Sequence, residues 1–252
     1  MLVTIRPATL PAAAADSLRD RVVLVTGVGG GLGSATARAV ARAGATAVLL
    51  GRRVRMLESL HDEIMQAGAP QPGIYPMDLL GATPKDHDDL AATLQREFGR
   101  LDGIVHAAVH FDSLQPFEQQ TPEEWATALH VNVTAPFLLT RACLPLLREG
   151  MDPAVVFVLD DPVRTGNAFW GGYGVSKHAL AGFASIVHEE TENTRVRTHA
   201  VLPGPMRTKL RRAAYYGENT LAHPEPDFAA GVIAGVLADG SGTRGAVIDL
   251  RP

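Results

Sequence analysis

Thr26-Gly27-Val28-Gly29-Gly30-Gly31-Leu32-Gly33 lies directly between an apolar run, Val22 to Val25, and an amphipathic stretch, Leu32 to Ala43. The continuously apolar run predicts a strand buried on both faces, and the stretch after the glycines predicts a helix. Glycine suits this turn because the pyrophosphate of a dinucleotide must approach the backbone closely, where a Cβ would intrude. A helix beyond the turn would direct free N–H groups at the phosphates. The segment therefore predicts a dinucleotide-binding turn.

Outward from this turn, short apolar runs alternate with longer amphipathic stretches, the pattern of repeated βαβ units. We therefore predict an α/β protein with a single-domain Rossmann fold over residues 21–252: a doubly wound parallel sheet of about seven strands with helices on both faces. Residues 1–20, which include Pro7, Pro11 and an alanine run, are expected to form a loosely ordered leader. The strands expected after the first are Ala47–Leu50, Ile74–Met77, Ile104–Ala108, Ala154–Leu159, Val196–Leu202 and Ala246–Leu250.

Composition narrows the classes of partner. The formal net charge of −4 provides no basic field for a nucleic-acid backbone, so we expect no nucleic-acid partner. No stretch of about 18 apolar residues and no signal-peptide pattern occurs, which predicts a cytoplasmic protein without a membrane partner. The nine histidines are not in a metal-binding spacing, so no metal is expected. Cys143, the single cysteine, is predicted to be a buried structural thiol.

Tyr173 and Lys177 are four residues apart in a predicted helix and so share one face of it. A free phenol has a pKa near about 10, too high for efficient proton exchange at neutral pH. A close ammonium favours the phenolate and would lower that pKa. The pair therefore predicts Tyr173 as a general acid/base assisted by Lys177.

Arg52 and Arg53 follow the second strand, where a dinucleotide fold meets the adenosine ribose. An acidic residue there would accept hydrogen bonds from the ribose hydroxyls and favour NAD(H). A guanidinium can instead pair with a 2′-phosphate. NADP(H) is therefore the favoured cofactor, and NAD(H) stays an alternative.

These motifs resemble those of the short-chain dehydrogenase/reductase (SDR) family, in order and spacing, from about residue 20 to the end of the chain. Thr26 to Gly33 is similar to the family's glycine motif, and Asp78-Leu79 to its adenine-contacting pair. Tyr173-Gly174-Val175-Ser176-Lys177 resembles the catalytic Tyr-x-x-x-Lys. The remaining matches are Asn132, which looks like the helix asparagine that holds a proton-relay water, and Pro203-Gly204. Within the family, the segments from Leu101 to His106 and from Trp125 to Leu147 are most similar to bacterial YciK-type oxidoreductases.

The resemblance implies an NAD(P)-dependent oxidoreductase that transfers hydride between a nicotinamide cofactor and a small alcohol or carbonyl substrate. It also implies a homodimer or homotetramer that associates through the helices carrying Asn132 and Tyr173. The catalytic candidates are Tyr173, Lys177, Asn132 and Asp160. The cofactor-binding candidates are Gly27, Gly29, Gly31, Leu32, Gly33, Arg52, Asp78, Leu79, Ala107, Ala108, Tyr173, Lys177 and Pro203.

Asp160 is the main departure from the family pattern, which has a serine thirteen residues before the tyrosine. The serine donates a hydrogen bond to the reacting carbonyl oxygen, whereas an ionised carboxylate donates none and would repel a developing oxyanion. Three accounts remain open. Asp160 is protonated, through burial and the neighbouring Asp161; or it binds a cationic or hydroxyl-rich substrate; or carbonyl chemistry is weakened or lost.

His106-Ala107-Ala108-Val109 is a second departure, because relatives carry Asn-Ala-Gly at its last three positions. Either compensating packing replaces the lost asparagine, or Val109 narrows the nicotinamide site. The alternative function is a non-catalytic dinucleotide-binding protein, a sensor or partner subunit. The irregular stretch from Pro203 to Pro226 is expected to form a mobile lid.

Overall fold

The computed structural model describes residues 2–6, 13–240 and 243–252. Its strands form one parallel sheet in the order β1-β8-β7-β6-β5-β2-β3-β4. The predicted doubly wound α/β fold is confirmed, and the described residues form eight strands instead of the expected seven or so. The strands are β1 Val3–Ile5, β2 Val22–Thr26, β3 Thr46–Gly51, β4 Gly73–Pro76, β5 Gly103–His106, β6 Ala154–Val158, β7 Arg197–Leu202 and β8 Ala246–Asp249.

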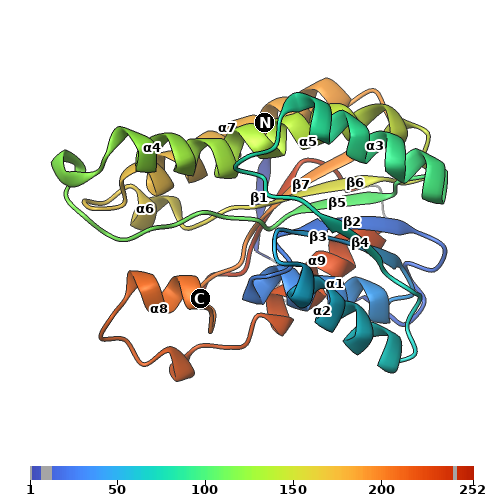
Figure 1. The fold of residues 1–252 in the computed structure, drawn as a ribbon, viewed down its shortest axis with the longest axis horizontal. Coiled ribbons are helices and arrows are strands. Elements are labelled where there is room, and N and C mark those ends of the chain that lie inside the picture. The colour runs from blue at the N-terminus through green and yellow to red at the C-terminus, as the bar shows by residue number, and fades with distance from the viewer. Residues whose placement is uncertain (1, 7–12, 241–242) are drawn as a thin grey trace.

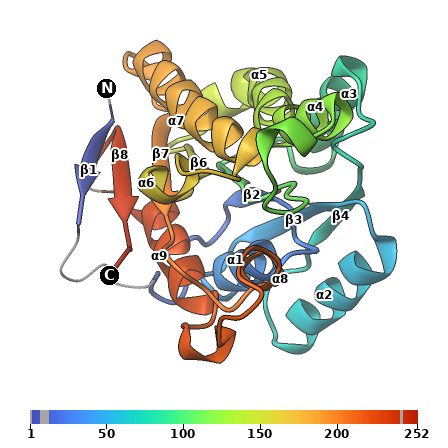
Figure 2. The same cartoon turned by 90° about the vertical axis from the view of Figure 1, so that its left-hand side faces the viewer.

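The additional strand is β1, which lies within residues 1–20, where no strand was expected. Its three residues are β-branched and extend the sheet beside β8, with Thr4 opposite Val247 (Figure 2). The part of the expected leader at residues 1 and 7–12 lies outside the described residues. The Arg6 guanidinium pairs with Asp249 of β8 at 3.1 Å, which holds the end of β1 against the sheet.

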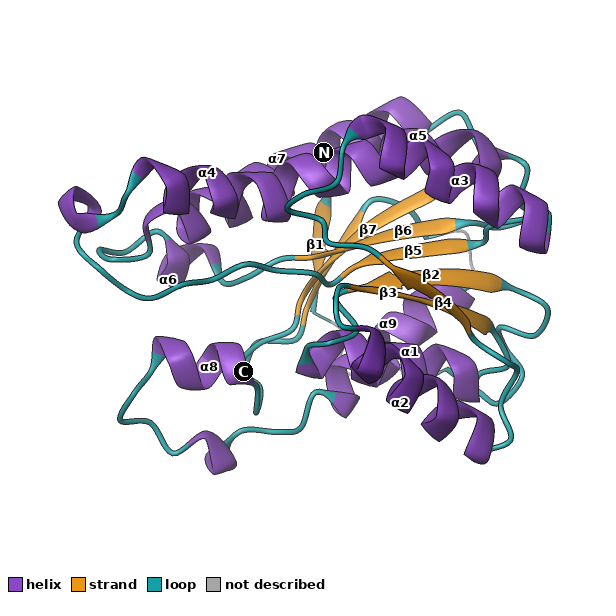
Figure 3. Cartoon of the chain, viewed as in Figure 1, coloured by secondary structure: helices purple, strands orange, loops and turns teal. Residues whose placement is uncertain are grey.

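Helices cover both faces of the sheet (Figures 1 and 3). One layer shields a core that includes Leu24, Ile104 and Phe157, and the other shields a core that includes Val25, Leu49 and Val156. The first layer consists of α3 Pro84–Phe98, α4 Pro122–Leu129, α5 Ala135–Arg148 and α7 Gly171–Thr191. The second consists of α1 Gly31–Arg42, α2 Val54–Gln66 and α9 Asp227–Ala238; two short helices, α6 Pro162–Thr165 and α8 Lys209–Ala214, lie in loops.

The α4–α5 segment illustrates how local sequence sets an element. Thr121 and Glu124 form a capping box, in which the Thr121 hydroxyl accepts from the Glu124 N–H and the Glu124 carboxylate accepts from the Thr121 N–H. A π-helical turn, His130–Thr134, joins α4 to α5. The two helices thus form one long helical segment from Pro122 to Arg148.

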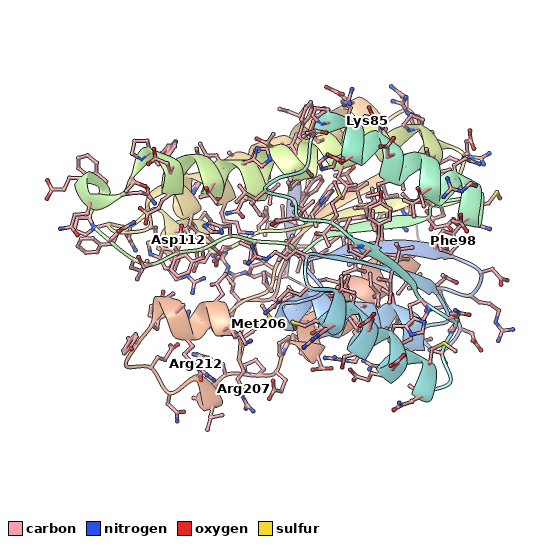
Figure 4. All side chains as sticks on the ribbon, viewed as in Figure 1. Lys85, Phe98, Asp112, Met206, Arg207 and Arg212 are labelled. Carbon is pink, nitrogen blue, oxygen red and sulfur yellow. The ribbon has the colours of Figure 1, made fainter. Side chains whose placement is uncertain are left out.

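The strand order reverses at β2 and β5, because the chain adds β3 and β4 on one side of β2 and later strands on the other. Ligands of open α/β sheets bind outside the carboxyl ends of the strands at such a point. The glycine turn follows β2, and the segment containing α8 follows β7; Figure 4 labels Met206, Arg207 and Arg212 on that segment. Among the described residues, no helix is both long enough and apolar enough to cross a membrane.

Candidate dinucleotide and active-site cleft

The glycine turn packs too closely to admit side chains at two of its positions. Gly27 has φ of 72°, and a Cβ there would lie 2.5 Å from the Ala108 Cα. A Cβ on Gly33 would overlap the Gly27 carbonyl oxygen. A Cβ on Gly30, by contrast, would meet only that same oxygen, at 3.3 Å. The turn therefore brings bare backbone up to the cavity, as a bound pyrophosphate requires.

Thr26 connects the glycine turn to the loop after β5. Its hydroxyl oxygen accepts hydrogen bonds from the backbone N–H groups of Ala107, at 3.1 Å, and Ala108, at 3.0 Å. These bonds tie the end of β2 to the loop after β5. Val109, which is 38 % exposed, lines both of the cavities described next.

The first cavity lies beyond β2 and β3, where the adenosine half of a dinucleotide would bind. Arg53 crosses the glycine turn, and its Nη2 donates to the Gly29 carbonyl at 2.9 Å. Arg52 is exposed on the same cavity. The structure therefore brings both arginines to the site predicted for a 2′-phosphate. Seven predicted cofactor residues line this cavity: Gly27, Gly29, Arg52, Asp78, Leu79, Ala107 and Ala108.

The second cavity lies beyond β6 and β7 and continues the first, because Gly30, Ala107, Val109 and Lys209 line both. Asp160 lines this second cavity. The remaining predicted cofactor residues line it too: Gly31, Leu32, Gly33, Tyr173, Lys177 and Pro203. The cleft as a whole thus brings together the predicted site residues except Asn132.

Tyr173 is buried in the second cavity, and its hydroxyl donates a 2.6 Å hydrogen bond to Asp160 Oδ2. Its ring meets Phe111 edge to face, with centroids 5.1 Å apart. Burial and the Asp160 carboxylate raise the pKa of Tyr173 well above its ordinary value. The predicted lowering of this pKa by Lys177 is therefore wrong for this arrangement, because an anion, not the ammonium, contacts the hydroxyl.

Lys177 is also buried, one helical turn from Tyr173. Its Nζ donates to the Val158 carbonyl at 2.9 Å and lies 5.8 Å from the centroid of the Tyr173 ring. Burial lowers the pKa of Lys177 to about 8. The ammonium is consequently held against the carboxyl end of β6, near the ring but bonded to the backbone.

Asp160 forms an ion pair with Arg164, four residues later on α6. The Arg164 guanidinium also lies over two rings, 5.2 Å from the Trp170 centroid and 5.7 Å from that of Tyr215. Burial disfavours the charge on Arg164, but Asp160 raises its pKa overall. The adjacent Asp161 points elsewhere, because its Oδ1 accepts from the Val163 N–H and pairs with Arg251 at 2.6 Å.

Asn132 lies beside the cleft but lines neither cavity. Its Oδ1 accepts from the His110 N–H at 2.7 Å, and its Nδ2 donates to the His110 carbonyl at 3.0 Å. Nδ2 also donates to the Ser176 hydroxyl at 2.9 Å, which fixes α7 between Tyr173 and Lys177. The observed contacts of Asn132 are therefore those of a residue that positions α7 and the loop after β5.

Sequence reasoning missed several residues of the second cavity. Arg164 could have been found from its four-residue spacing after Asp160, which places a cation one turn from a carboxylate. The others depend on α8 folding over the glycine turn, where a Cβ on Gly31 would lie 3.3 Å from Thr208 Cγ2. No local signal predicts that contact. The missed residues are Arg164, Thr208, Lys209, Arg211 and Tyr215.

Comparisons with known proteins agree with this geometry. Residues 21–219 match the family model for short chain dehydrogenases. The chain is 36% identical to the uncharacterised oxidoreductase YciK of Escherichia coli K12 over 204 residues, which cover 81% of each sequence. The solved structure of YciK from E. coli superposes with a TM-score of 0.92 at 33% identity, covering 97% of this chain and 100% of that one.

A protein assigned as a short chain dehydrogenase from E. coli CFT073 has been solved with NADPH bound. It superposes with a TM-score of 0.90 at 34% identity, covering 94% of this chain and 99% of that one.

Proposed function

Because this chain belongs to the short chain dehydrogenase family of oxidoreductases, we propose that it interconverts a small alcohol and its carbonyl compound with NADP(H). One observation carries the proposal: Tyr173 and Lys177 line a cavity that is continuous with the glycine-turn cavity. A dinucleotide lying on the glycine turn would therefore extend its nicotinamide toward the phenol.

The chain's own residues fit such a cofactor. The glycine turn would hold the pyrophosphate at the start of α1, where the first N–H groups of the helix are free. Asp78 and Leu79 would flank the adenine. Arg52 and Arg53 would pair with a 2′-phosphate, which is why we favour NADP(H) over NAD(H). The NADPH complex of the structural relative supports this choice.

Tyr173 would supply the proton in the reductive direction. When bound, NADPH provides the hydride that adds to the carbonyl carbon. Tyr173 would transfer its hydroxyl proton to the carbonyl oxygen, which gives the alcohol and leaves a phenolate. Lys177 would stabilise that phenolate and hold the nicotinamide ribose, because it is a buried ammonium whose Nζ lies 5.8 Å from the centre of the Tyr173 ring. In the oxidative direction the same proton returns to Tyr173.

Asp160 and Arg164 would set the charge beside the reacting oxygen. Asp160 alone would repel a developing oxyanion, but its ion pair with Arg164 offsets that charge. A substrate oxygen must take the Tyr173 hydrogen bond that Asp160 accepts in this structure. Asn132, through Ser176, would keep α7 in the position that this exchange requires.

We further propose a homodimer or homotetramer that associates through α5 and α7. Large apolar side chains are exposed on both helices, among them Phe137 at 45 % and Ile186 at 56 %. Exposed apolar residues on neighbouring helices favour burial between copies. Sedimentation of the wild type against Ile186→Glu tests this, since a charge there should dissociate the assembly.

The function is tested by cofactor titration followed by a turnover screen. NADPH should bind more tightly than NADH, measured by nucleotide fluorescence. A panel of aldehydes, ketones and alcohols should then show carbonyl-dependent oxidation of NADPH or alcohol-dependent reduction of NADP⁺. Tight NADPH binding without turnover on any member of the panel would contradict the proposal and favour a dinucleotide-binding protein without catalysis.

A further inference from the structure

The Asp160 carboxylate uses its two oxygens differently. Oδ1 accepts from the Arg164 guanidinium and from the Asp161 N–H, the latter at 2.7 Å. Oδ2 accepts from the Tyr173 hydroxyl at 2.6 Å. The Asp160 side chain is only 13% exposed, and the hydrogen bond from Tyr173 is the one found at Oδ2 among the described residues. Tyr173 is therefore the donor on which Oδ2 depends.

A phenol carries one O–H proton and cannot donate it to two acceptors fully. If Tyr173 directs its proton to a substrate oxygen, as the proposed function requires, Oδ2 loses its donor. A largely buried carboxylate oxygen without a donor is strongly unfavourable. A substrate that displaces this hydrogen bond can itself bring the replacement donor to Oδ2.

The charges around Asp160 select the kind of donor. Arg164 already pairs with Oδ1, and its guanidinium lies near the Trp170 and Tyr215 rings. Lys177 places a second buried cation in the same cavity. A substrate ammonium would lie close to both cations, whereas a hydroxyl adds no charge. The donor is therefore expected to be neutral.

Geometry also limits where that hydroxyl lies on the substrate. The Tyr173 oxygen and Asp160 Oδ2 are neighbours, 2.6 Å apart while they share the phenol proton, and each would contact one substrate oxygen. Contacts to two neighbouring groups require substrate oxygens that lie close together, as oxygens on adjacent carbons do. The hydroxyl therefore belongs on the carbon next to the reacting one.

We propose that the substrate is an α-hydroxycarbonyl compound, or the corresponding vicinal diol, whose second hydroxyl donates to Asp160. The proposal rests on the proposed oxidoreductase function and names its substrate class. Asp160, at the position where the family carries a serine, becomes the residue that determines specificity.

Isosteric substrate pairs test the proposal in the wild-type enzyme. Hydroxyacetone has a hydroxyl where butanone has a methyl. The same difference separates α-hydroxyacetophenone from propiophenone. With saturating NADPH, kcat/KM should be roughly 10- to 100-fold higher for each hydroxyketone, the range of a hydrogen bond to a charged group. Aminoacetone, which presents an ammonium, should be a poorer substrate than hydroxyacetone. Equal values within the pairs, or a preference for aminoacetone, would overturn the proposal.

Asp160→Ser separates this recognition from the intrinsic reactivity of hydroxyketones. In Asp160→Ser the ratio of kcat/KM for a hydroxyketone to that for its methyl counterpart should fall to about three or less, because the charged acceptor is gone. Asp88→Ser, at an exposed surface carboxylate on α3, is the matched control and should retain the wild-type ratio. An unchanged ratio in a folded Asp160→Ser variant would contradict the proposal.

Binding of diols to the complex of the protein with NADP⁺ distinguishes a failure of the proposed substrate class from a failure of the proposed oxidoreductase function. Propylene glycol should bind the wild-type complex more tightly than sec-butanol, measured by ligand-observed NMR. Asp160-dependent diol binding without turnover would uphold the ligand class and contradict the oxidoreductase function. Turnover without diol selectivity would uphold the function and overturn the ligand class.

Discussion

The Tyr173 hydroxyl donates a 2.6 Å hydrogen bond to the Asp160 carboxylate. This contact places an anion on the phenol that the proposed function uses as an acid and a base. Arg164 balances the anion, while Lys177 is bonded to the Val158 carbonyl. Under the proposed function, proton transfer in this cleft would depend on how the substrate displaces the Asp160 hydrogen bond.

Lys177→Met is expected to change the pH dependence of stability. In the folded protein burial lowers the pKa of Lys177 to about 8, whereas the unfolded chain keeps the ordinary value of 10.5. Between these values the unfolded state binds more protons, so the contribution of Lys177 to stability rises with pH, by about 1.4 kcal/mol per unit. Below pH 8 both states are protonated and the full cost of burying the ammonium is present.

Urea unfolding of the cofactor-free protein at pH 7 and near pH 10 checks this. The free energy of unfolding of the wild type should increase relative to that of Lys177→Met as the pH rises. Lys209→Met, at an exposed lysine on the same cleft, should show no comparable trend. A wild-type to Lys177→Met difference that is independent of pH would show that the ammonium is not buried as described.

The double variant Arg52→Ala/Arg53→Ala tests the choice of cofactor. Loss of charge-assisted contacts to the 2′-phosphate should weaken NADPH binding roughly 10- to 100-fold. NADH has no such phosphate, so its affinity should change little. Arg55→Ala removes an exposed arginine of α2 that lines neither cavity and should bind both nucleotides like the wild type. An equal loss for NADH and NADPH would assign the arginines to another role.

Gly33→Ala tests the close packing of the glycine turn. Its Cβ would overlap the Gly27 carbonyl oxygen, so the turn must move. NADPH affinity should fall at least about tenfold, or about 1.4 kcal/mol. Gly182→Ala, on α7, adds a Cβ that meets no atom within 4 Å and should leave the affinity unchanged. Normal NADPH binding by Gly33→Ala would contradict the placement of the pyrophosphate on this turn.

Much of the fold could be predicted because buried parallel strands and amphipathic helices have distinct periodicities. Val22 to Val25 is apolar without a break because helices cover both faces of β2. Strand β1 escaped prediction for the opposite reason. It has three residues, with Val3 and Ile5 both exposed, so no burial pattern marks it. Its position is set by pairing with β8, far away in sequence.

The site could be predicted where a motif requires one backbone geometry, as at Gly27 and Gly33. The electrostatics of Tyr173 could not, because they depend on which partner its hydroxyl meets. Spacing suggested Lys177, whereas folding brings Asp160 to the hydroxyl. Spacing could have indicated the pairing of Arg164 with Asp160, but the position of its guanidinium over the Trp170 and Tyr215 rings is a tertiary feature that no sequence period encodes.

The most direct test of Tyr173 as the proton donor is the single-turnover rate at which Tyr173→Phe oxidises NADPH with a carbonyl substrate of the wild type. Phenylalanine keeps the ring and removes the acidic proton, so the rate should fall roughly 10²- to 10⁴-fold while NADPH affinity stays unchanged. Tyr216→Phe, at a fully exposed tyrosine, should react at the wild-type rate. A Tyr173→Phe rate close to that of the wild type, with NADPH bound normally, would contradict the assignment of Tyr173 as the proton donor.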